Sequence, residues 1–155
     1  MKVIISGYGK MGHMIEGICL RRNIEVVECS EDICSVDPAV ARECICIDFT
    51  TPDAWKANYA WIAANFKAVV VGTTGWDAQR EEIFAEFEKN NCPLIYSSNY
   101  SLGVNAVFAA LEKISKTLSG AGYVPHIEEL HHAAKLDAPS GTAKKMAEIV
   151  DRGMG

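Results

Sequence analysis

No apolar run in the 155-residue sequence approaches the roughly 18–20 residues that a membrane-spanning helix needs. The N-terminus also lacks the form of a signal peptide, because Met1 and Lys2 lead directly into a short apolar run that ends at Gly7. Basic residues are not in excess: the formal net charge is -5, which argues against the basic face that nucleic-acid binding requires. These absences predict a cytoplasmic globular protein that binds neither membranes nor nucleic acid.

The six cysteines lack the paired short spacing of zinc ligands, since no C-x-x-C pair occurs and Cys44-x-Cys46 alone supplies too few ligands. Cys44 and Cys46 alternate with Ile45 and Ile47 in an apolar stretch, which indicates thiols buried in a core strand. We therefore predict reduced cysteines and no metal site.

Short apolar runs alternate with helical patterns, and the sequence contains no repeat or low-complexity segment. The predicted strands are Val3–Ile5, Ile24–Cys29, Cys44–Phe49, Ala68–Val71 and Pro93–Tyr96. The predicted helices run from Gly12 to a stop at Asn23, from Pro52 to Phe66, around Ile83–Phe87, and over Val104–Leu118. Helices of this length between strands predict parallel strands with right-handed crossovers, which is a doubly wound α/β sheet.

The flexible stretch Ser119–Gly122 predicts a boundary between a first domain, residues 1–120, and a second segment, residues 121–155. In the second segment Ile127–His132 is expected to be a strand and Thr142–Val150 a helix. One strand and one helix cannot enclose a core of their own. The second segment is therefore expected to be the start of an incomplete α+β domain.

The run Gly7-Tyr8-Gly9-Lys10-Met11-Gly12 matches G-x-G-x-x-G and lies between a predicted strand and a predicted helix. Gly7 permits the tight turn, Gly9 lets the backbone approach a pyrophosphate, and Gly12 lets the helix pack on the strand. The phosphates would then meet free N–H groups at the helix start. An ordinary strand–helix turn is the alternative. The context favours a Rossmann-like dinucleotide-binding domain.

An acidic residue about 20 residues after this motif commonly binds the adenosine ribose. Glu31 follows the second predicted strand, with Asp32 beside it and Glu28 as a rival. A carboxylate there favours NADH and repels the 2′-phosphate of NADPH, whereas Lys10 is able to bind a phosphate. NADH is the predicted preference, and solvated loop acids remain the alternative.

Small polar residues follow three other predicted strands, at the edge where open α/β sheets bind ligands. The stretches are Asp48-Phe49-Thr50, Gly72-Thr73-Thr74-Gly75 and Ser97-Ser98-Asn99-Tyr100-Ser101. Each alone is more often a plain turn. Together they are expected to line a cofactor cleft.

Acid–base and anion-binding groups are concentrated between Glu129 and Thr142. Because a histidine side chain can exchange a proton near neutral pH, His131 and His132 are candidate proton donors, and Lys135 adds a positive charge. Ser140-Gly141-Thr142 opens a predicted helix, whose free N–H groups suit a carboxylate.

The segment Glu129–Ala143 reads E-L-H-H-A-A-K-L-D-A-P-S-G-T-A and resembles the signature of the dihydrodipicolinate reductase (4-hydroxy-tetrahydrodipicolinate reductase) family, E-x-H-H-x-x-K-x-D-A-P-S-G-T-A. The other motifs agree in order: Gly7–Gly12, Asp48–Thr50, Gly72–Gly75 and Ser98–Asn105. The resemblance extends to about Val150, which is nearly the whole chain.

This resemblance implies NAD(P)H-dependent reduction of a cyclic imine dicarboxylate to tetrahydrodipicolinate in lysine and diaminopimelate biosynthesis. It implies that His131 is the proton donor and Lys135 a second acid or charge stabiliser. The implied substrate-binding residues are His132, Ser140, Gly141 and Thr142. The implied cofactor-binding residues are Gly7 to Gly12, Glu31, Gly72, Thr73, Thr74, Ser97, Ser98, Asn99 and Tyr100.

Members of this family continue with several more strands, which complete a substrate domain and build a homotetramer. The resemblance therefore implies that a chain ending at Gly155 is C-terminally truncated, with an incomplete substrate domain. Three alternatives stay open. They are a non-catalytic dinucleotide-binding or redox-sensing module, an interaction protein that uses the α/β fold structurally, and another dehydrogenase with the same cofactor half.

Overall fold

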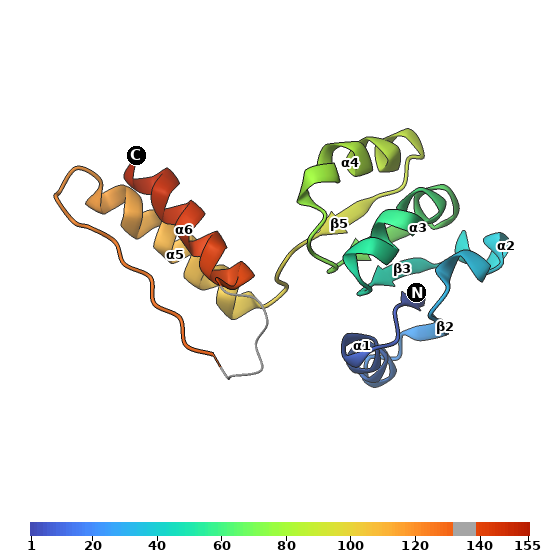
Figure 1. Ribbon diagram of the computed structural model, residues 1–155. Helices are drawn as coiled ribbons and strands as arrows, with labels where there is room; N and C mark the ends of the chain where they lie inside the picture. Colours follow the sequence, from blue (N-terminus) through green and yellow to red (C-terminus); the bar gives the residue numbers. More distant parts are fainter. Residues whose placement is uncertain (132–138) are drawn as a thin grey trace. The chain divides into compact units, whose positions relative to one another are not determined.

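The computed structural model describes residues 1–131 and 139–155. The chain forms two compact units, Met1–Ser98 and Asn99–Gly155 (Figure 1). Among the described residues, none of the helices combines the length and the apolar character needed to cross a bilayer.

Strands and helices alternate throughout the first unit. Its strands are β1 (Lys2–Ser6), β2 (Glu25–Ser30), β3 (Ile45–Asp48), β4 (Ala68–Val71) and β5 (Leu94–Tyr96). Its α-helices are α1 (Lys10–Arg21), α2 (Pro38–Ala41), α3 (Pro52–Asn65) and α4 (Arg80–Lys89), and short 3-10 turns cover Ile33–Ser35 and Asp77–Gln79.

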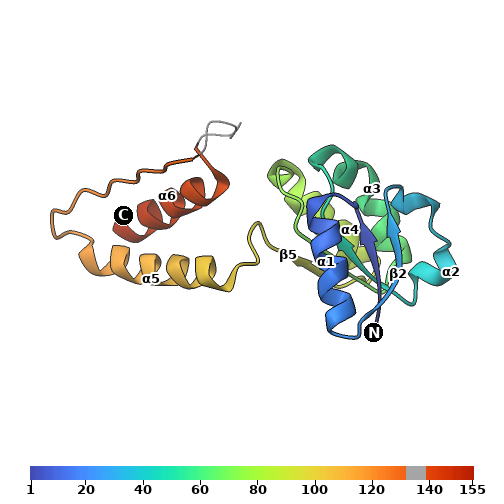
Figure 2. The same ribbon diagram turned by 90° about the horizontal axis from the view of Figure 1, so that it is seen from below.

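The five strands form one parallel sheet in the order β2-β1-β3-β4-β5. Helix α1 covers one face of this sheet, and α3 and α4 cover the other (Figure 2). The chain moves from β1 outward to β2, and then returns to the opposite side of β1 to form β3. The strand order therefore reverses between β1 and β3, where doubly wound sheets bind ligands at their carboxyl edge. The predicted Rossmann-like α/β class is confirmed.

Local sequence explains where these elements begin and end. Helix α3 begins after Thr51, whose hydroxyl oxygen accepts a hydrogen bond from the N–H of Ala54 at 3.3 Å, and Pro52 occupies its first turn. Helix α1 stops before Asn23, which adopts a left-handed φ of 54°, a conformation that asparagine tolerates well. Both ends agree with the sequence prediction.

The core lies between the sheet and helices α3 and α4. Its largest fully buried side chains include Trp55, Trp76 and Phe87. Cys44 and Cys46 are fully buried, as the alternation with isoleucine predicted. Burial raises the pKa of the Cys46 thiol well above its ordinary value, so this thiol stays protonated and behaves as a small apolar side chain.

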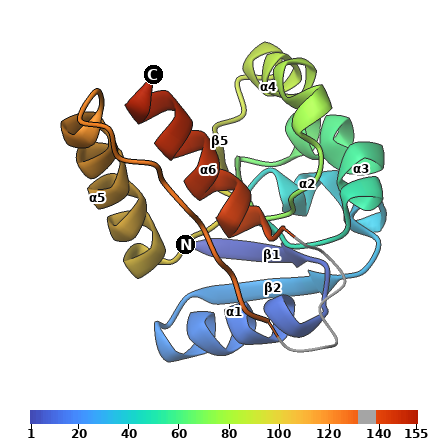
Figure 3. The same cartoon turned by 60° about the vertical axis from the view of Figure 1, so that its left-hand side comes forward.

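The second unit contains α5 (Leu102–Leu118) and α6 (Gly141–Met154), which lie side by side (Figure 3). A Cβ added to Gly153 would lie 2.5 Å from the Cβ of Ser115, so the two helix backbones approach closely there. The Ser119 hydroxyl donates a hydrogen bond to the carbonyl of Met154 at 2.9 Å. Because α5 packs on α6, the compact units divide after Ser98, whereas the sequence analysis placed the domain boundary at residue 120.

The strand expected over Ile127–His132 is wrong for its described part. Residues 127–131 have no regular secondary structure. A strand needs a hydrogen-bonded neighbour, and the described part of the chain supplies none to these residues. His132 lies outside the described residues. The helix expected at Thr142–Val150 is present as α6 and is longer at both ends.

Candidate functional site

The first glycine of the motif forms the tight turn that follows β1. Gly7 has a φ of +86°, which favours glycine, and its N–H donates to the carbonyl of Ser30 at 2.9 Å. A Cβ on Gly12 would lie 2.3 Å from the carbonyl oxygen of Gly7, so a larger residue there would push α1 off the turn. Gly7 thus forms the tight turn that the sequence predicted, and the close neighbours of Gly12 belong to this turn instead of the strand.

The N-terminus of α1 is open above Gly9. Gly9 is the N-cap residue and supplies no side-chain cap, and a Cβ placed on it would meet no atom within 4 Å. Lys10 and Met11, which follow it, are exposed. The first N–H groups of a helix have no acceptor within the helix, so this end offers donors and positive potential to an anion. A pyrophosphate fits this geometry.

The side chain of Tyr8 is fixed against α1. Its ring stacks on that of His13 with 3.9 Å between centroids, and its hydroxyl donates to Oε2 of Glu16 at 2.5 Å. This hydrogen bond is the main cause that raises the pKa of Tyr8 to about 12, so the phenol stays protonated at neutral pH. The hydroxyl is therefore engaged within the protein, which leaves the backbone of Tyr8 to serve the predicted cofactor role.

The predicted ribose acid follows β2 directly. The carbonyl of Ser30 holds the N–H of Gly7, and Glu31 is the next residue along the chain. Glu31 and Asp32 are both exposed. The rival Glu28 lies within β2, where it pairs with Ile4, two residues short of the strand end. Glu31 is therefore adjacent to Ser30, the residue hydrogen-bonded to the glycine turn, whereas Glu28 lies two residues before Ser30 within the strand.

The carboxyl group of Asp48 accepts hydrogen bonds from hydroxyl groups near the ends of three strands. Asp48 is 1% exposed and ends β3. The Ser6 hydroxyl, at the end of β1, donates to Oδ2 at 2.7 Å, and the Thr73 hydroxyl, after β4, donates to Oδ1 at 2.6 Å. The Thr50 hydroxyl donates to Oδ1 at 3.0 Å. The sequence analysis expected Asp48–Thr50 at the cleft, and it gave Asp48 no separate role.

Aromatic side chains of the protein interior pack against the backbone of the loop Gly72–Gly75. A Cβ on Gly72 would lie 2.1 Å from the ring of Phe49, so that ring lies directly on the loop backbone. The indole N–H of Trp76 donates to the carbonyl of Thr73 at 2.6 Å. The hydroxyl of Thr73 is also engaged, whereas Thr74 is exposed. Of the two threonines predicted to bind cofactor, Thr74 has the side chain that is open to solvent.

The predicted stretch Ser97–Tyr100 spans the division between the two units. Ser97 and Ser98 follow β5 in the first unit, and Asn99 and Tyr100 begin the second. The side-chain oxygen of Asn99 accepts a hydrogen bond from the N–H of Ser101 at 2.8 Å, which forms a turn just before α5. Tyr100 is 45% exposed.

In the second unit, Ser140 opens α6. Its hydroxyl oxygen accepts a hydrogen bond from the N–H of Ala143 at 3.1 Å, and its own N–H donates to Oε1 of Glu129 at 2.8 Å. Oε2 of Glu129 lies 3.9 Å from Nδ1 of His131. Gly141, where an added Cβ would meet no atom within 4 Å, and the exposed Thr142 form the open first turn. This end of α6 suits an anion such as a carboxylate.

Two of the predicted substrate and catalytic residues, His132 and Lys135, lie outside the described residues. Among its described residues, the structure places His131 near Ser140, the residue before Gly141 and Thr142, because both contact the Glu129 carboxyl group. It also adds Glu129, which the sequence analysis gave no role. The sequence signal that could have identified it is its position at the start of the signature, two residues before His131.

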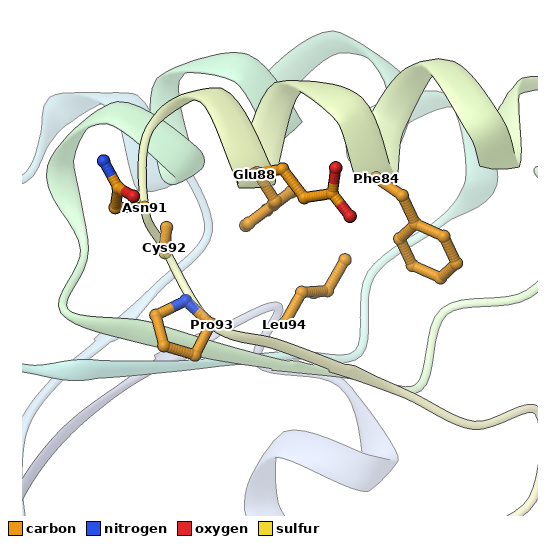
Figure 4. A pocket seen from close by; sticks show the side chains of 7 residues that line it. Phe84, Glu88, Asn91, Cys92, Pro93 and Leu94 are labelled. Atoms are coloured by element: carbon orange, nitrogen blue, oxygen red, sulfur yellow. The ribbon is translucent and has the colours of Figure 1, made fainter.

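A separate cavity of about 540 Å³ lies between α4 and the start of β5 (Figure 4). Its lining residues are Phe84, Phe87, Glu88, Asn91, Cys92, Pro93 and Leu94. In a parallel sheet the start of a strand is opposite to the carboxyl edge that carries the glycine turn. This cavity is therefore distinct from the predicted cofactor site.

Comparison with known proteins gives matches over both units. Residues 1–100 match the family model described as dihydrodipicolinate reductase, N-terminus, and residues 103–155 match the model described as dihydrodipicolinate reductase, C-terminus. A 4-hydroxy-tetrahydrodipicolinate reductase of Christiangramia forsetii is 37% identical over 97% of this chain and 64% of its own length. The corresponding protein of Cupriavidus metallidurans is 35% identical over 100% of this chain and 67% of its length.

A solved structure is also similar. It is the dipicolinate-bound dihydrodipicolinate reductase from Paenisporosarcina sp. TG-14, with 26% identity and a TM-score of 0.67. The match covers 99% of this chain and 66% of that one. The chain thus spans 64% of the first curated relative and 66% of the solved one, which is slightly less than two thirds of either.

Proposed function

Because the chain belongs to the dihydrodipicolinate reductase family, we propose that it serves the NAD(P)H-dependent reduction of 4-hydroxy-tetrahydrodipicolinate. The reduction proceeds via dihydrodipicolinate to tetrahydrodipicolinate, in lysine and diaminopimelate biosynthesis. The observation that carries the proposal is the glycine turn Gly7–Gly12, which leaves an open helix N-terminus at the carboxyl edge of a doubly wound sheet.

The first unit supplies the dinucleotide-binding half in this proposal. The N–H groups that begin α1 bind the pyrophosphate, and Gly9 lets it approach the backbone. Glu31 binds the adenosine ribose, which makes NADH the preferred cofactor. Thr74 and the backbone of Gly72–Gly75 line the crevice beside β4, and Ser97, Ser98, Asn99 and Tyr100 are proposed as further cofactor contacts. When bound, NAD(P)H supplies the hydride.

The second unit supplies acid–base groups and the substrate anchor. Reduction of the conjugated imine leaves an enamine-like anion that requires a proton, and His131 donates it. Nδ1 of His131 faces Glu129, so Nε2 is the nitrogen directed toward substrate. Lys135 stabilises the developing negative charge, and His132 contacts the substrate. The N–H groups at Ser140-Gly141-Thr142 hold a substrate carboxylate.

Family membership supports two further parts of the proposal. We expect the protein to act in the cytoplasm, where this biosynthetic reaction would take place. We also expect a homotetramer in the assembly that carries out the full reaction.

The experiment that tests the proposed function is a fluorescence titration of the chain with NADH, in the presence and absence of pyridine-2,6-dicarboxylate. This probe is chosen because a similar solved reductase is described as dipicolinate-bound. NADH binding that the dicarboxylate tightens is the expected result. Binding of NADH without any response to the dicarboxylate would favour a dinucleotide-binding module. Binding of neither compound would refute the proposal for this chain.

A further inference from the structure

Asp48 is a buried acidic residue at the point where the strand order reverses. It lies on β3 and pairs in register with Ser6 on β1 and with Val71 on β4. The donors that Asp48 meets within the described residues are hydroxyl and amide groups, and no ion pair in this part of the chain includes it.

A buried acidic residue of this kind is unfavourable for the free energy of folding. Burial of a carboxylate without a cationic partner costs several kcal/mol, only partly offset by hydrogen bonds, and an apolar residue of similar size avoids this cost. Its neighbours on the same strand, Cys46 and Ile47, are apolar. Residues that lower stability are concentrated at functional sites in proteins. A role of Asp48 is therefore expected in the proposed cofactor crevice.

The hydrogen bonds of Asp48 lead to both glycine loops. The Thr50 hydroxyl donates a hydrogen bond to Oδ1 of Asp48 at 3.0 Å, and a Cβ on Gly7 would lie 2.8 Å from the Thr50 methyl carbon. Thr73 donates to Asp48 at 2.6 Å and accepts from the N–H of Thr50 at 2.8 Å. Asp48 therefore sets the positions of two threonines, one against the glycine turn after β1 and one inside the loop after β4.

We propose that Asp48 is a positioning residue for the dinucleotide, acting through Thr50 and Thr73. Its carboxyl group turns both hydroxyls inward, so that the turn Gly7–Gly12 and the loop Gly72–Gly75 present backbone groups to the crevice in a fixed geometry. Preorganisation of this kind improves affinity because less ordering remains to be done on binding. The inference rests on the dinucleotide binding proposed above.

The test compares Asp48→Asn, Thr73→Val and the double variant with the unaltered chain. Asp48→Asn keeps the shape and replaces one acceptor oxygen with a donor, so one hydroxyl must turn away. Cys92→Ala is the matched control, because it removes a buried side chain that precedes β5, at the opposite edge of the sheet. The measurements are NADH or NADPH titration well below each unfolding midpoint, and backbone amide hydrogen exchange without ligand.

Asp48→Asn and Thr73→Val are each expected to weaken NADH binding about tenfold, equivalent to about 1.4 kcal/mol. The double variant is expected to be no weaker than the poorer single one, because the two residues act as one unit. Exchange is expected to quicken in residues 6–12, 49–52 and 72–76. Cys92→Ala is expected to lower the unfolding midpoint without changing affinity.

Three results would overturn the inference: unchanged affinity in folded Asp48→Asn, unchanged exchange in both loops, or an equal loss of affinity in Cys92→Ala. An unaltered chain that binds neither NADH nor NADPH refutes the proposed function. In that case the exchange measurement still decides whether Asp48 fixes the two loops.

Discussion

Oε1 of Glu129 accepts a hydrogen bond from the backbone N–H of Ser140, with 2.8 Å between the two atoms. Oε2 of the same carboxyl group lies 3.9 Å from Nδ1 of His131. One side chain thus connects the proposed proton donor with the helix start that is proposed to hold a substrate carboxylate. Ser140 follows His131 by nine residues in the sequence, and Glu129, which contacts both, has neither of these proposed roles.

Two substitutions of Glu129 test whether its hydrogen bond to Ser140 supports the proposed carboxylate site. Glu129→Ala removes the acceptor of the Ser140 N–H and is expected to weaken pyridine-2,6-dicarboxylate binding roughly tenfold, because a hydrogen bond to a charged group contributes about 1.5 kcal/mol or more. Glu129→Gln keeps an acceptor oxygen and is expected to retain most of the affinity. Calorimetric titration with NADH present measures both variants. Equal losses in Glu129→Ala and in the exposed neighbour Glu128→Ala would contradict this role.

The glycine turn predicts a sharp effect at Gly9. Gly9→Val is expected to abolish NADH binding, because the added side chain occupies the open space where the pyrophosphate approaches. The fold is expected to persist, since an added Cβ meets no atom within 4 Å. The matched control is Gly17→Ala within α1, where the new Cβ makes an ordinary contact at 3.5 Å with Arg21. Unchanged NADH affinity in folded Gly9→Val would remove this turn from the cofactor site.

Cofactor preference is tested at the end of β2. Glu31→Gln is expected to improve NADPH binding relative to NADH by roughly fivefold, since repulsion of a 2′-phosphate in a wet site is on the order of 1 kcal/mol. Glu28→Gln serves as the control, because Glu28 lies within the strand. Competition titration with both cofactors measures the ratio. If Glu28→Gln changes the ratio and Glu31→Gln does not, Glu28 is the ribose acid.

The proton-donor assignment predicts a kinetic effect without a binding effect. His131→Ala is expected to lower kcat by roughly 10²–10⁴-fold, because a positioned general acid contributes about that much, and to leave NADH affinity unchanged. Lys135→Ala is expected to behave similarly. Steady-state kinetics and NADH titration give the two quantities, with the exposed His126→Ala as the control histidine. Near-normal turnover in both His131→Ala and Lys135→Ala would exclude them from the chemistry.

Thiol reactivity tests the buried core directly. Burial raises the pKa of Cys92 to about 11 and also raises the pKa of Cys46 well above its ordinary value. Both thiols therefore stay protonated at pH 8, and they are expected to resist iodoacetamide in the folded protein. The exposed Cys34 is expected to react first. Mass spectrometry of labelled peptides measures the order, and early labelling of Cys46 would mean that β3 is not in the core.

The order of strands and helices was predictable because each depends on a few neighbouring residues. The apolar run Val3–Ile5, the cap at Thr51 and the stop at Asn23 all act within one turn or one strand. The glycine motif was also predictable, because the strand before it and the helix after it are adjacent in the sequence. The fold class followed from these elements through the handedness of crossovers.

The residues that join distant segments were not predictable in this way. The hydrogen bonds of Asp48 reach Ser6, 42 residues away, and Thr73, 25 residues away, and no periodicity encodes such contacts. The strand predicted over Ile127–His132 is wrong over its described residues, 127–131, for a related reason. Strand pairing depends on a neighbouring strand, which the local sequence does not reveal.

Trp76 is buried, and its indole N–H holds the carbonyl of Thr73 at 2.6 Å. Its ring centroid lies 4.5 Å from that of Tyr96 and 5.7 Å from that of Trp55. A fluorophore is therefore attached by hydrogen bond to a loop of the proposed crevice. Tryptophan emission overlaps the absorption of a reduced nicotinamide ring, so resonance energy transfer from Trp76 would report the arrival of that ring without any added label.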